Sequence, residues 1–179
     1  MKILKYVLLL LLAVVVGLGI YTAVQPSEYD FARSRTIDAP AQVLYENVDD
    51  YKKRALWDPW VERDPSINIT YGEKVKGPGA SYSWTSDEGD GTITRTESVP
   101  HESLSDELDF GSMGKATAYW KFEPEGGGTK VSWGMKAQNV PFAMKFFSAI
   151  SGGYEGMMGP VFDRGLVRLD SIAQIVVKE

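Results

Sequence analysis

The sequence predicts an α+β fold in which a curved, seven-stranded antiparallel sheet wraps around one long C-terminal helix. Two observations lead to this prediction. Seven segments between residues 31 and 135 alternate apolar and polar side chains, and a final segment repeats apolar side chains at steps of three or four residues. A sheet with one apolar face must cover that face, and the C-terminal helix is the long amphipathic element available to do so. A third observation, an uninterrupted apolar run near the N-terminus, adds one membrane-spanning helix to this fold.

The N-terminal run extends from Tyr6 to Val24, 19 residues without a charge. At about 1.5 Å per residue, a helix of this length matches a hydrocarbon core of about 30 Å. Lys2 and Lys5 precede the run and carboxylates follow it, so we expect a single-pass protein of the cytoplasmic membrane, with its N-terminus inside and its domain extracytoplasmic. A cleaved signal segment and a buried core helix are the alternatives, although the candidate cleavage sites near residues 17–19 and 22–24 are poor.

The predicted organisation is therefore an anchor or signal segment over residues 1–25, a linker over 26–30 and one domain over 31–179. The chain has a net charge of −5, and its first 24 residues contribute two lysines and no acid. The acidic remainder argues against a nucleic-acid partner and against a domain that lies on anionic headgroups. The sequence contains no cysteine, which excludes disulfides, thiolate metal sites and cysteine nucleophiles.

The strands are predicted from alternation between turn signals, and short turns imply antiparallel neighbours. Their expected ranges are Phe31–Ile37, Ile67–Tyr71, Ala80–Thr85, Thr92–Val99, Glu102–Phe110, Ala116–Phe122 and Thr129–Met135.

Two short helices are expected between the first and second strands. Pro40 suits the first turn of a helix over residues 40–48, and Asp49 or Asp50 can cap a second helix that ends near Leu56. Trp57 and Trp60 flank an Asp-Pro turn, where they either plug one end of the core or contact a ligand.

The long C-terminal helix begins at about Tyr154, and Pro160 either falls near its start, where proline is tolerated, or marks a kink. The apolar stretch before it, around Phe142, Met144, Phe146 and Phe147, is a lid, a membrane-touching patch or a buried loop.

A curved sheet that grips one helix leaves a gap where inward side chains are small. Aromatic residues then line a mostly apolar cavity, the usual composition of a small-molecule site. The expected occupant is a hydrophobic small molecule or lipid. The candidate ligand-binding residues are Tyr82, Trp84, Leu108, Phe110, Trp120, Trp133, Phe162 and Leu166.

Reactive groups are sparse, and we assign no catalytic residue, metal ligand or cofactor. His101, the single histidine, follows a proline in a predicted turn and is expected to be solvated. Asp106 has two interpretations. It faces inward between Leu104 and Leu108, where it needs a partner such as Arg95, or a bulge turns it to water. Arg95 and Glu97 alternate with Thr94 and Thr96, and the sequence leaves open which of these two pairs faces inward.

Several stretches resemble the START-like helix-grip superfamily (SRPBCC), and most closely its polyketide cyclase/dehydrase and lipid transport branch. They are RTIDAPAQVLYENV, Trp57-x-Pro-Trp60, GPGASYSW, TITRTESVP, WKFEPEGGGTKVSWGM and MGPVFDRGLVRLD, in that order across residues 31–175. The resemblance implies a seven-stranded sheet, a deep cavity under the last helix and binding of lipids, polyketides or other apolar molecules. It does not transfer catalysis, because enzymes and carriers share this scaffold. Membrane-tethered binding or transport is therefore the first hypothesis, and a cyclase or dehydratase acting on a polyketide-like substrate is the alternative.

Overall fold

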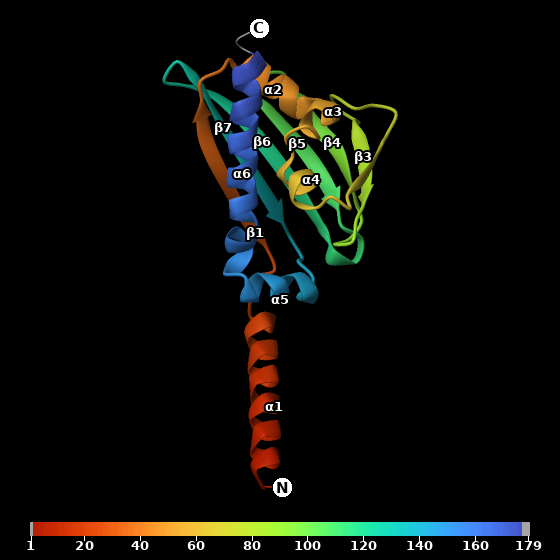
Figure 1. Ribbon diagram of the computed structural model, residues 1–179, viewed down its shortest axis with the longest axis vertical. Coiled ribbons are helices and arrows are strands. Elements are labelled where there is room, and N and C mark those ends of the chain that lie inside the picture. The colour runs from red at the N-terminus through yellow and green to blue at the C-terminus, as the bar shows by residue number, and fades with distance from the viewer. Residues whose placement is uncertain (1, 177–179) are drawn as a thin grey trace.

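One antiparallel sheet of seven strands organises the domain, in the order β1-β7-β6-β5-β4-β3-β2. The computed structural model describes residues 2–176 (Figure 1). Met1 and residues 177–179, which the predicted anchor and domain include, lie outside the described residues. The strands are β1 (Tyr29–Ile37), β2 (Asn68–Tyr71), β3 (Ser81–Thr85), β4 (Gly91–Val99), β5 (Ser103–Asp109), β6 (Lys115–Glu125) and β7 (Gly128–Ala137). The predicted α+β fold with its seven antiparallel strands is confirmed.

The strand register brings the inward side chains of neighbouring strands opposite one another. Trp120 of β6 pairs with Trp133 of β7, and Arg33 of β1 pairs with the same Trp133. Because side chains alternate along a strand, a single register places whole rows of residues on the inner face. Trp120 and Trp133 are both fully buried, so this row forms the centre of the core.

Three short helices connect β1 to β2: α2 (Ala41–Asp49), α3 (Tyr51–Arg54) and α4 (Pro59–Arg63). Asp50 caps α3 as predicted, because its carboxylate accepts a hydrogen bond from the Lys52 backbone at 2.9 Å. The third helix occupies the segment for which only an Asp-Pro turn was predicted. There Asp58 accepts from the Trp60 backbone at 2.9 Å, and Pro59 takes the first helical position.

The long helix α6 (Gly153–Val176) crosses the inner face of the sheet, and the shorter α5 (Phe142–Ile150) precedes it (Figure 1). Pro160 lies inside α6, in its third turn from the N-terminus. Gly165 lets α6 approach the structure beneath it closely. A Cβ at this position would lie 2.6 Å from the ring of Trp133 and 3.0 Å from Pro59. The helix is therefore seated on both the sheet and α4.

The N-terminal helix α1 (Lys2–Ala23) projects away from the domain (Figure 1). It is long and apolar enough to cross a membrane, and its most apolar 18-residue window has no buried residue. This exposure excludes the buried core helix that the sequence left open. A membrane-spanning helix and a signal sequence both remain consistent with α1.

Hydrogen bonds hold the junction between α1 and the sheet. The Tyr154 hydroxyl donates to the carbonyl of Pro26 at 3.2 Å, and the Val140 backbone donates to that of Ser27 at 2.9 Å. The first strand begins at Tyr29, two residues before its predicted start at Phe31. Within the predicted linker over 26–30, the carbonyls of Pro26 and Ser27 therefore accept hydrogen bonds from the domain, and residues 29 and 30 belong to β1.

Candidate functional site

The space directly beneath α6 is filled by stacked aromatic side chains. Trp133 lies between Trp120 and Phe162, with ring centroids 4.5 Å and 4.1 Å away and interplanar angles of 16° and 2°. Trp57 packs edge-on against both indoles, and Leu166 of α6 is fully buried beside them. Four of the eight predicted ligand-binding residues (Trp120, Trp133, Phe162 and Leu166) are therefore packed into the core.

The other predicted residues lie on β3, on β5 and just after β5, in a more accessible part of the inner face. Tyr82, Trp84 and Phe110 are half-buried and form a row, with ring centroids 6.1 Å apart for the first pair and 5.8 Å for the second. Leu108 is buried, and the register places it in the same cross-strand row as Ile93 and Tyr82. The Trp84 indole covers Gly91 of β4, where a Cβ would lie 2.2 Å from the ring. Glycine is therefore needed at this position for the row to form.

A buried ionic network lies between these two groups of aromatic residues. Asp106 faces inward and is fully buried, so the first of its two sequence interpretations is correct. The bulge is in β4, between Arg95 and Glu97, and it leaves Arg95 inward and Glu97 exposed. The Asp106 carboxylate accepts from the Arg95 Nε at 2.5 Å and from the Tyr51 hydroxyl at 2.8 Å.

Arg54 joins this network to the tryptophan stack. Its guanidinium lies 3.2 Å from the Asp58 carboxylate and 3.4 Å from that of Asp106. It also faces the rings of Trp120 and Trp133 at 5.7 Å and 5.6 Å, within the range of cation–π attraction. The charges are thus neutralised inside an otherwise aromatic interior.

The electrostatics keep the phenols of the network neutral. Burial raises the pKa of Tyr51 above its ordinary value, and the neighbouring Asp106 raises it further. Burial also raises the pKa of Tyr82. At Arg54, burial lowers the pKa of the guanidinium, but Tyr82, Asp58 and Asp106 outweigh this effect and leave the pKa above its ordinary value. The arginine is therefore charged and both phenols are protonated, and the Tyr51 hydroxyl donates to Asp106.

Two buried donors in the stack lack a partner. The indole N–H groups of Trp120 and Trp133 reach no acceptor within residues 2–176. An unpaired buried donor costs about 1–3 kcal/mol, and most buried donors in proteins are paired with a protein group or an ordered water. The Trp57 indole, by contrast, donates to the carbonyl of Asn47 at 3.1 Å.

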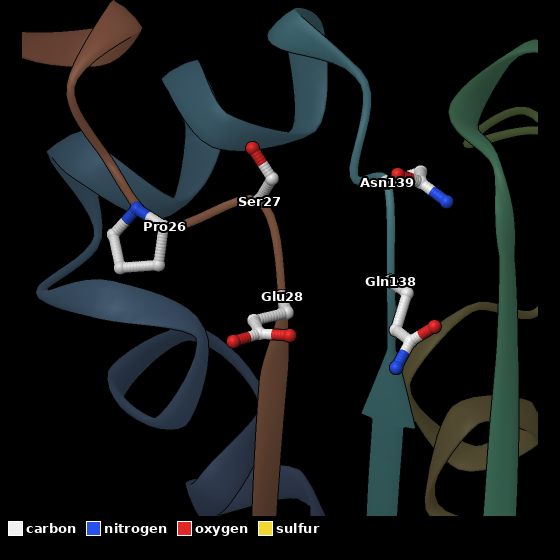
Figure 2. Close-up of a pocket in the computed structure, with 5 residues that line it drawn as sticks. All are labelled: Pro26, Ser27, Glu28, Gln138 and Asn139. Atoms are coloured by element: carbon white, nitrogen blue, oxygen red, sulfur yellow. The ribbon is translucent and has the colours of Figure 1, made fainter.

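Two open hollows lie elsewhere, at the end of the sheet nearest α1. The smaller, of about 370 Å³, lies between the segment that enters β1 and the segment that leaves β7, as Figure 2 shows. Its lining residues are Pro26, Ser27, Glu28, Gln138 and Asn139. The larger, of about 800 Å³, continues along the ends of β1, β6 and β7 and is lined by charged residues together with Tyr29, Ala116 and Ala137. None of the eight predicted ligand-binding residues lines either hollow.

Sequence reasoning missed Tyr51, Arg54 and Asp58 as members of the site. All three are on or beside short helices, and Tyr51 meets Asp106 across 55 positions of sequence. No local periodicity signals such a pairing. The Asp-Pro dipeptide that caps α4 was the one available clue to the position of Asp58.

His101 lies at the surface, in the turn between β4 and β5, as expected. Its backbone has φ of 64°, and its ring meets that of Tyr45 edge-on at 5.5 Å. Within residues 2–176, no three histidine or acidic side chains are grouped so as to hold a metal ion.

Solved structures with the same fold share little sequence with this chain. A protein of unknown function from Staphylococcus aureus has a TM-score of 0.64 at 10% identity, over 87% of this chain and 99% of its own. A putative uncharacterized protein from Rhizobium leguminosarum gives 0.59 at 15%, over 82% and 95%. The di-domain ARO/CYC StfQ from the steffimycin biosynthetic pathway gives 0.61 at 18%, over 85% of this chain and 52% of that one.

No protein with a curated function matches the sequence. The family described as polyketide cyclase/dehydrase and lipid transport matches residues 29–174, which is the whole sheet and nearly all of α6. The chain therefore belongs to the polyketide cyclase/dehydrase and lipid transport family.

Proposed function

We propose that this protein binds an apolar small molecule or lipid on the inner face of its sheet, while α1 tethers the domain to the outer side of the cytoplasmic membrane. The half-buried row of Tyr82, Trp84 and Phe110 carries this proposal. These rings expose apolar surface in the same cluster as the covered Trp120, Trp133 and Phe162, and aromatic surface of this kind is typical of ligand sites.

The buried half of the site supports the same proposal. Trp120, Trp133, Phe162 and Leu166 would form the rigid wall behind the ligand, and Leu108 would join the row to that wall. The lysines before α1 and the acidic domain after it support an N-terminus in the cytoplasm and an extracytoplasmic domain.

The alternative is a cyclase or dehydratase that acts on a polyketide-like substrate, and the inward position of Asp106 favours it. Its carboxylate, however, already accepts from Tyr51 and Arg95 and lies beside Arg54. A catalytic acid or base needs an oxygen that can reach the substrate. Binding or transport therefore has the stronger support.

Mass spectrometry of the species retained by purified residues 26–179 tests the proposal. We expect the wild-type domain to retain an apolar compound, and Trp84→Ala to reduce its affinity roughly tenfold because a central aromatic contact is lost. Tyr119→Ala is the matched control, since Tyr119 is also half-buried but bonds Asp30 on the opposite face of the sheet. Equal losses in the two variants, or an empty wild-type domain, would contradict the proposal.

A further inference from the structure

The short helix α5 presents its apolar side to the outside of the domain. Phe142, Phe147 and Ile150 are 56%, 49% and 58% exposed. At 100° per residue they share one side of the helix, whereas Ser148 on the other side is 2% exposed. A helix on the surface of a soluble domain normally does the opposite, with polar residues outward. The outward face of α5 therefore calls for an apolar partner.

The position of α5 identifies the partner. The helix packs against α1 and lies across its C-terminal end, between α1 and the sheet (Figure 1). Thr22, near that end of α1, is fully buried. The Lys145 ammonium of α5 also donates to the Ser27 hydroxyl at 2.6 Å. Contacts on both sides of the junction thus fix α5 relative to α1.

The length of α1 then sets the depth of α5. Its 22 residues span about 33 Å, close to the hydrocarbon thickness of about 30 Å. When α1 crosses the bilayer, its last turn lies at the boundary between the acyl chains and the headgroups. Ile20 and Tyr21 of that turn are more than half exposed, so the apolar surface of α1 continues to the helix that packs across its end.

We propose that α5 is an interfacial helix that lies in the outer leaflet and docks the domain on the bilayer. This inference rests on the proposed membrane tether and adds a second attachment to it. Phe142, Phe147 and Ile150 insert among the acyl chains, as the apolar faces of helices parallel to a membrane do. The hollow beside Ser27 then lies at headgroup level, next to the point where α1 leaves the bilayer.

The cysteine-free chain allows a direct test with single cysteines in the full-length protein. Phe147→Cys and Ile150→Cys would each carry an environment-sensitive nitrobenzoxadiazole label in phosphatidylcholine vesicles. Leu56→Cys is the matched control, because Leu56 is an apolar side chain with 68% exposure. The Leu56 carbonyl accepts a hydrogen bond from Arg168 of α6. Arg168 lies fifteen residues, or roughly 22 Å along the helix axis, beyond the start of α6, so Leu56 lies far from the end of the domain that carries α5. Leu9→Cys reports on α1 itself.

Brominated acyl chains should quench the labels at residues 147 and 150, and iodide in the buffer should quench them much less than it quenches the label at residue 56. For an interfacial depth of about 5–10 Å, we expect the iodide quenching constant there to be roughly a third or less of that at residue 56. Iodide quenching equal to that at residue 56 would overturn the proposal. Protection from both quenchers would overturn it too, because a second protein surface would then cover α5. Quenching by bromolipids at residue 9 but not at residues 147 and 150 would leave the tether intact and refute only the docking of α5.

Discussion

Replacing Asp106 by asparagine removes one charge from the buried network while keeping the shape of the side chain. Asp106 accepts from the Arg95 Nε at 2.5 Å and the Tyr51 hydroxyl at 2.8 Å, and it lies 3.4 Å from Arg54. Removing one partner of a buried ion pair costs about 3–5 kcal/mol, because the other partner stays buried without its counter-charge. Asp49 and Asp58 still pair with the two arginines, so we expect a loss near the lower limit, about 3 kcal/mol.

Urea unfolding of the full chain in detergent micelles measures this loss, with tryptophan fluorescence as the signal. Trp120 and Trp133 face Arg54 and therefore report on the network. Asp109→Asn is the matched control on the same strand, because Asp109 pairs with Lys115 at 3.0 Å but is 37% exposed. Such a surface pair contributes at most about 1 kcal/mol.

A loss of about 1 kcal/mol or less in Asp106→Asn, equal to that of the control, would refute the argument that the network is buried and mutually neutralised. The double variant Asp106→Asn/Arg95→Met provides a second check. Arg95 and Asp106 contact each other, so the second substitution removes a group whose main partner is already lost, and the loss in the double variant should be smaller than the sum of the two single losses.

Two further predictions concern the seating of α6. Gly165→Ala should destabilise the protein by about 1–3 kcal/mol, because its Cβ would lie 2.6 Å from Trp133 and 3.0 Å from Pro59; unchanged thermal unfolding would contradict the close approach. Glu62 should make stability depend on pH, because its hydrogen bond to Arg164 lowers the pKa of its carboxyl below its ordinary value. Its contribution is complete above the unfolded-state pKa and is lost as pH falls through the lower folded-state value. Glu62→Gln should reduce the dependence of the unfolding free energy on pH in this acidic range. The same pH dependence in both proteins would contradict this prediction.

The candidate site could be predicted from sequence only in part. Alternation placed Trp84, Trp120 and Trp133 on the inner face, because side chains on a strand repeat every two residues. The same alternation does not show which side chains from other elements pack on the inner face of the sheet. It therefore gave no sign that Phe162 would stack on Trp133, or that Trp84 would remain half-exposed.

The charges of the site were harder to predict than its aromatic residues. A carboxylate at an inward position is tolerable only when cations reach it, and the partners of Asp106 come from β4 and α3. The direction of α5 posed the same problem. Its apolar composition fitted a lid, a membrane-touching patch or a buried loop, and only its packing against α1 shows which side is exposed.

Sequence by itself determined the features that depend on spacing along the chain. These are the seven antiparallel strands, the apolar N-terminal helix and the long C-terminal helix, because periodicity, turn residues and run length are local properties. Tertiary structure alone decided that α6 rests on a filled aromatic stack and that Asp106 is buried among arginines. It also decided that α5 turns Phe142 and Phe147 outward. Those outcomes depend on contacts between segments far apart in sequence, and their free energies are set by what each side chain meets after folding.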